Sequence, residues 1–79
     1  MDTRDQVIAL VTRVTRNEEV ADLPDLDLVD AGLLDSLAFV ELLVGLEDVV
    51  GEPIPPTEVD RSELSSLTRI LEFVAEYDA

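Results

Sequence analysis

The chain of 79 residues contains no cysteine, histidine or tryptophan, and arginine is its only basic residue. Without cysteine it can form neither disulfides nor thiolate metal sites, which fits a reducing, cytoplasmic setting. Without histidine, cysteine or lysine it lacks the side chains that usually activate a serine nucleophile. We therefore expect no catalytic residues, no metal site and no enzymatic activity of the chain alone.

Positive charge is also scarce, with 5 arginines against 19 acidic residues and a formal net charge of -14. Such a charge repels nucleic acid and anionic membranes, and it attracts proteins that present basic patches. The acids are concentrated between Glu18 and Glu63, where 14 of them surround a single base, Arg61. We expect Arg61 to pair with Glu58 or Asp60 rather than to act in recognition.

Long apolar runs are absent, and so is the layout of a signal peptide. No stretch reaches the roughly 18 uninterrupted apolar residues of a membrane span, and the first residues are polar. The apolar fraction of 47% nevertheless suffices for one small core. We expect one domain over residues 1–79, monomeric, without membrane insertion.

Apolar residues recur at helical spacing, and no strand pattern is present. The sequence predicts a first helix at about 4–16 after a capping box at 3–6, a second at 37–50, a short third at 57–62, and a last helix capped by Ser65 or Ser66. A long connection at 17–35, with Pro24 and Gly32, separates the first two helices and wraps the core. The fold class is therefore all-α, a four-helix bundle.

The helix at 37–50 has two apolar sides. A helical wheel with about 3.6 residues per turn predicts one core side. That side contains Phe39, Leu42, Leu43, Leu46 and Val50. The opposite side mixes apolar with acidic residues and suggests a docking surface, although single exposed apolar residues are common. Its members are Leu37, Val40, Glu41, Val44, Glu47 and Asp48.

Ser36 lies at the start of this helix and has two interpretations. As an N-cap, its oxygen accepts a bond from a free backbone N–H of the first turn. Alternatively it carries a covalent group, since a helix start favours a negatively charged phosphate. Because nothing nearby can activate the hydroxyl, a separate enzyme would have to modify Ser36.

The segment Gly32-Leu33-Leu34-Asp35-Ser36-Leu37, followed by Val40-Glu41-Leu42 and Leu46-Glu47, resembles the phosphopantetheine-attachment motif of acyl and peptidyl carrier proteins. The resemblance covers nearly the whole chain. Within the family it is most similar to D-alanyl carrier proteins and related stand-alone aminoacyl carriers. Residues 27–36 and 58–64 carry that likeness.

The resemblance implies a bundle of the acyl-carrier-protein type and a non-catalytic role. Ser36 would bear 4′-phosphopantetheine, donated by coenzyme A through a phosphopantetheinyl transferase, and would make the chain a phosphoprotein. Asp35 would orient the serine at the transferase. The arm ends in a thiol that holds cargo as a thioester, and the acidic and apolar side of the second helix would face partner enzymes.

For the cargo, the resemblance implies an aminoacyl group, loaded by an adenylate-forming ligase and passed to an acyltransferase or another biosynthetic enzyme. The pathway would be cell-wall synthesis or the synthesis of natural products such as polyketide or nonribosomal peptide antibiotics. A fatty acyl or malonyl carrier has the same serine motif. An acidic helical adaptor that binds a basic partner without needing Ser36 is a further alternative.

Overall fold

The computed structural model describes residues 2–78, in which helices alternate with loops and no strand occurs. Three are α-helices and three are short 3₁₀ helices, which confirms the all-α class. In chain order they are α1 (Thr3–Thr15), η1 (Glu18–Asp22), α2 (Ser36–Val50), η2 (Pro56–Glu58), η3 (Arg61–Leu64) and α3 (Leu67–Asp78). Met1 and Ala79, the ends of the expected domain 1–79, lie outside the described residues. Within that range no helix has the length and apolar content needed to cross a bilayer.

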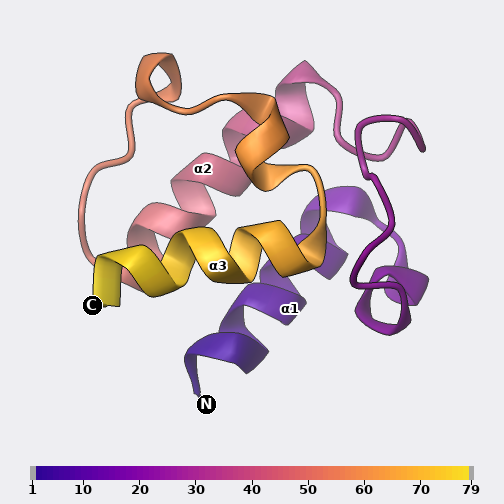
Figure 1. Cartoon of the computed structure of the whole chain (residues 1–79), viewed down its shortest axis with the longest axis horizontal. Coiled ribbons are helices and arrows are strands. Elements are labelled where there is room, and N and C mark those ends of the chain that lie inside the picture. The colour runs from indigo at the N-terminus through magenta and orange to yellow at the C-terminus, as the bar shows by residue number, and fades with distance from the viewer. Residues whose placement is uncertain (1, 79) are drawn as a thin grey trace.

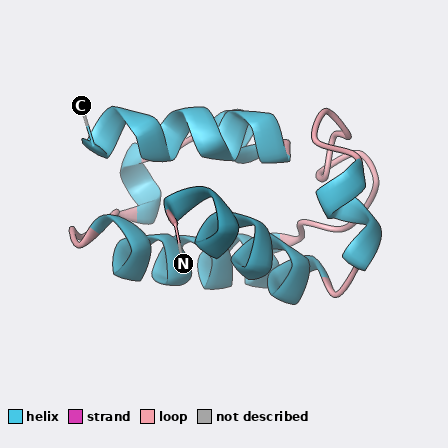
Figure 2. Cartoon of the chain, turned by 90° about the horizontal axis from the view of Figure 1, so that it is seen from below, coloured by secondary structure: helices cyan, strands magenta, loops and turns pink. Residues whose placement is uncertain are grey.

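The three α-helices form two layers around one core. Helices α1 and α2 lie together in one layer, and α3 lies across them in the other (Figures 1 and 2). Apolar residues from all three helices fill the space between the layers, because each helix has one apolar stripe to bury. The buried members from these helices are Val7, Leu10, Val11, Val14, Ala38, Phe39, Leu42, Leu43, Leu46, Leu67, Ile70 and Val74.

The predicted short helix at 57–62 is wrong. Two 3₁₀ turns, η2 and η3, replace it, and the backbone between them is extended at Val59 (φ -125°, ψ 126°) and Asp60 (φ -83°, ψ 145°). This extended backbone separates the segment into pieces of three and four residues, which are too short for an α-helix. The β-branched side chain of Val59 favours the extended conformation. Leu64, the last residue of η3, is fully buried.

Helices α1 and α2 begin and end within one residue of the predicted positions, but their N-caps differ from the predicted ones. Asp2, not Thr3, caps α1 by accepting a bond from the Asp5 backbone N–H at 2.9 Å. The helix ends at Thr15, and its C-cap Arg16 adopts the left-handed conformation with φ 57°. At α3 the prediction is confirmed, because the Ser66 hydroxyl accepts a bond from the Arg69 N–H at 3.2 Å.

The connection between α1 and α2 covers one end of the core and is attached to the start of α3. The Leu28 N–H donates to the Ser65 carbonyl at 2.6 Å, and the Thr68 N–H donates to the Pro24 carbonyl at 3.0 Å. The Thr68 hydroxyl also bonds the Asp25 carboxylate at 2.9 Å. Leu28 is fully buried. These contacts hold the segment that leads into α2.

Candidate functional site

Ser36 is the first residue of α2 and not its cap. Asp35 is the N-cap, with extended backbone and a carboxylate that accepts a bond from the Ala38 N–H at 2.8 Å. The interpretation of Ser36 as N-cap is therefore wrong, because the preceding carboxylate already satisfies the first turn. Ser36 is exposed, and because Asp35 caps the helix, the Ser36 hydroxyl is available for other chemistry.

The hydroxyl of Ser36 accepts a hydrogen bond from Arg61, which comes from η3. The distance from Arg61 Nη2 to Ser36 Oγ is 2.6 Å. The guanidinium carbon lies 5.6 Å from the centroid of the Phe39 ring, within the range of a cation–π contact. The chain leaving α2 returns along the bundle and brings η3 beside the first half of α2 (Figure 1).

This partner of Arg61 differs from the expected one. The sequence predicts pairing with Glu58 or Asp60, whereas the structure places the guanidinium on a serine that lies 25 residues earlier in the chain. Sequence reasoning missed the contact because it depends on how the segment after α2 folds back. The available signal was that Arg61 is the one base among many acids.

The exposed side of α2 runs on from Ser36. Leu37 is 69% exposed, Val44 57% and Val40 46%, while Glu41 and Asp48 are also exposed. The wheel therefore correctly identified which side faces solvent. It also identified the core side, apart from Val50, which is only partly buried.

Glu47 differs from the other members of that side. It is half-buried, and its carboxylate accepts a bond from the Ile54 N–H at 2.7 Å. Ile54 is itself buried. Glu47 therefore holds the turn after α2 against the helix, whatever else it contacts.

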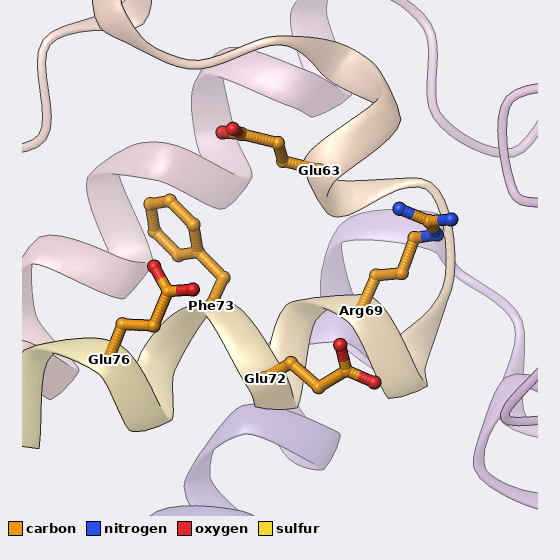
Figure 3. A pocket seen from close by; sticks show the side chains of 5 residues that line it. All are labelled: Glu63, Arg69, Glu72, Phe73 and Glu76. Carbon is orange, nitrogen blue, oxygen red and sulfur yellow. The ribbon is translucent and has the colours of Figure 1, made fainter. Parts of the chain in front are cut away.

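Two surface hollows differ in their relation to Ser36. The first lies between the end of α1 and the start of α2, next to the serine. Its lining residues are Val14, Thr15, Arg16, Gly32, Leu33, Asp35, Leu37, Ala38 and Glu41. The second, shown in Figure 3, lies between η3 and α3 and contains no part of α2. It is lined by Glu63, Arg69, Glu72, Phe73 and Glu76.

The surroundings of Ser36 fit a phosphate ester. The hydroxyl is exposed at a helix N-terminus, whose free N–H groups and dipole favour negative charge. A guanidinium, the side chain best suited to phosphate oxygens, already contacts that hydroxyl.

Comparison with known proteins gives two concordant results. Residues 5–74 match the family described as "Phosphopantetheine attachment site". The chain is 41% identical to the D-alanyl carrier protein of Abiotrophia defectiva over 89% of each sequence. It is 38% identical to that of Streptococcus equi subsp. zooepidemicus, covering 96% of this chain and 95% of the relative. It is 36% identical to that of Bacillus pumilus, covering 96% and 97%. The chain therefore belongs to the phosphopantetheine-binding family of carrier proteins, which hold 4′-phosphopantetheine covalently.

Proposed function

We propose that Ser36 is the residue that bears the phosphopantetheine arm, and that the loaded protein carries a small aminoacyl group between enzymes. The observation that carries this proposal is the exposed Ser36 hydroxyl at the start of α2, in contact with Arg61. When bound, the arm supplies a thiol that holds the cargo as a thioester. A tethered carrier keeps its cargo at high local concentration for successive partners.

Modification of Ser36 requires a separate phosphopantetheinyl transferase. The reaction forms the bond from Oγ to phosphorus, breaks the pyrophosphate bond of coenzyme A and releases adenosine 3′,5′-bisphosphate. The serine proton passes to a base of the transferase, because no histidine, lysine or cysteine is present in this chain. Asp35 contributes by starting α2 at Ser36, which fixes the direction in which the hydroxyl leaves the helix.

The exposed side of α2 is the surface we propose for docking. Apolar Leu37, Val40 and Val44 supply contact area, and acidic Glu41 and Asp48 attract basic patches on the partner enzymes. Glu47 contributes to this surface indirectly, because its carboxylate binds the Ile54 N–H and holds the turn that follows α2. Partners that bind here reach Ser36 directly, since Leu37 is its neighbour.

The relatives support a proposal for the cargo. They are D-alanyl carrier proteins, so we propose that an adenylate-forming ligase loads D-alanine or another small amino acid and that an acyltransferase receives it. The pathway we propose is cell-wall synthesis or natural-product synthesis, the latter including polyketide and nonribosomal peptide pathways. A fatty acyl or malonyl cargo is the alternative within the family.

Attachment is tested by incubating the unmodified protein with coenzyme A and a broad-specificity transferase, and by measuring intact mass. The wild type should gain one arm, and Ser36→Ala should gain none. Ser62→Ala is the matched control, since Ser62 is also exposed and lies beside Arg61, and it should load normally. A wild type that gains no mass, as an acidic adaptor would, refutes the proposal.

The cargo is tested on the protein that already carries the phosphopantetheine arm. One reaction contains ATP and a D-alanine-activating ligase, and a parallel reaction contains malonyl coenzyme A and a malonyltransferase. We expect a further mass increment of one alanyl group in the first reaction and none in the second. Loading by the malonyltransferase alone would favour the fatty acyl or malonyl alternative.

Docking is tested by comparing Val40→Asp with Leu23→Asp. Both side chains are 46% exposed, but Leu23 lies in the connection before α2. Loss of an apolar contact at the centre of an interface should lower kcat/KM for aminoacylation about tenfold in Val40→Asp. Leu23→Asp should stay close to the wild type. Equal rates for the two variants would remove this side of α2 as the docking surface.

A further inference from the structure

Arg61 is held over the start of α2 by two contacts. Its guanidinium donates to Ser36 Oγ and lies against the ring of Phe39, which is only 7% exposed. The buried ring gives the guanidinium a fixed platform, because the packed core restricts its movement. Arg61 itself is exposed and therefore accessible to a group attached at Ser36.

The charges around Arg61 make this placement unusual. Acidic neighbours such as Asp60 and Glu63 are close in sequence, and a charge-assisted bond to a carboxylate is stronger than a bond to a neutral hydroxyl. The guanidinium nevertheless contacts the hydroxyl. Arg61 is also the one base between Glu18 and Glu63. This single cation of the acidic region therefore lies at the candidate attachment residue, Ser36.

We propose that Arg61 is the counter-ion of the phosphodiester on Ser36, an inference that rests on the proposed function. Esterification makes Oγ a poor acceptor and brings two non-bridging phosphate oxygens within reach of the guanidinium. The neutral contact of the unmodified protein becomes a charge-assisted, bidentate one. Arg61 thereby positions the first bonds of the arm and offsets a new negative charge beside Asp35.

This exchange has a structural consequence. Arg61 belongs to η3 and Ser36 to α2, so a stronger bond between them ties the segment after α2 more firmly to the helix. Anything that interacts with the folded state alone raises its stability. Modification of Ser36 should therefore stabilise the wild type more than a protein that lacks the guanidinium.

The test uses wild type, Arg61→Gln, Arg61→Lys and Arg69→Gln, each in unmodified and loaded form at low salt. Arg69→Gln is the matched control, because it removes the same charge from an exposed position on α3. Excess coenzyme A and transferase drive loading to completion, and intact mass verifies it. The measurements are the ³¹P chemical shift of the phosphodiester and the rise in Tm on loading.

We expect Arg61→Gln to move the ³¹P resonance and to lose most of the rise in Tm on loading. Arg69→Gln should match the wild type, and Arg61→Lys should recover part of both effects. Added NaCl should move the wild-type resonance towards the Arg61→Gln position, which provides a second measure. Identical resonances and equal rises in Tm in all four loaded proteins would overturn the role of Arg61 while leaving the proposed function intact. A wild type that cannot be loaded would overturn both.

Discussion

Ser36 and Asp35 divide two tasks that a single serine often performs. The carboxylate of Asp35 caps α2, and the hydroxyl of Ser36, one position later, is left exposed. A serine that caps its own helix would have its oxygen occupied by a backbone N–H. The pair Asp-Ser therefore combines a stable helix start with an accessible hydroxyl.

The cap gives a prediction for Asp35. Asp35→Ala should lower the free energy of unfolding by about 1 kcal/mol, because an N–H of the first turn loses its acceptor. Asp35→Asn should lose much less, since asparagine is an equally good N-cap. Urea unfolding followed by circular dichroism measures both. If the two variants are equally destabilised, charge and not capping accounts for the role of Asp35.

Glu47 leads to a second prediction. Glu47→Ala should remove the acceptor of the Ile54 N–H and destabilise the protein by about 1 to 3 kcal/mol, because this donor is partly buried. Amide hydrogen exchange at Ile54 should accelerate more than exchange in α1. Glu47→Gln retains a side-chain oxygen and should show a smaller change. Unaltered exchange at Ile54 in Glu47→Ala would contradict the assigned contact.

Between elements, the close approach of α1 and α2 depends on Gly45. A Cβ at this position would meet the side chain of Leu10 at less than van der Waals distance, with 2.8 Å to Cδ2. Leu10 is buried, so its side chain would have to shift within the core to make room. Glycine in the middle of a helix normally costs up to about 1 kcal/mol relative to alanine, so this contact explains why it is present.

We therefore expect Gly45→Val to destabilise the protein by about 1 to 3 kcal/mol through overpacking against α1. The same change in a Leu10→Ala background should cost much less, because the space it needs is vacant there. A double-mutant cycle from urea unfolding measures this coupling. Strictly additive effects of the two changes would show that Leu10 is not the obstacle.

For the molecule as a whole, the net charge of -14 should influence both stability and association. Like charges repel in the folded state and are screened by salt, with a Debye length of about 10 Å at 0.1 M. The same field attracts basic partners, and salt weakens that attraction. Folding and docking should therefore respond to salt in opposite directions.

Raising NaCl from low concentration to 0.5 M should increase Tm, by about 4 to 8 °C if screening recovers about 1 kcal/mol. Scanning calorimetry measures this shift. A variant that combines Glu58→Gln, Glu72→Gln and Glu76→Gln, all at exposed positions, carries less negative charge and should show a smaller increase. A Tm that is insensitive to salt in both proteins would mean that self-repulsion is unimportant here.

Residue order alone was enough to predict the all-α class, the ranges of α1 and α2 within one residue, the start of α3 and the solvent-exposed side of α2. Periodicity works here because each helix has one side to bury, and burial follows directly from spacing. Ser36 as the attachment residue stays a prediction, made from its place before an apolar helical pattern and from the resemblance of residues 32–37 to a known motif. Side chains at the edge of a buried stripe are less predictable from spacing alone: Tyr77, near the end of α3, is 36% exposed and packs on Phe73.

The tertiary structure decided two things: which of two neighbouring residues caps α2, and which residues far apart in the chain come into contact. Asp35 and Ser36 are both good N-caps, and only the backbone path shows which of them serves. The bonds of Arg61 to Ser36 and of Glu47 to Ile54 depend on how the segment after α2 turns back, which proline and glycine positions permit but do not specify. The cation beside the candidate attachment serine is thus a product of tertiary structure, because residues far apart in the chain meet only when the core has formed.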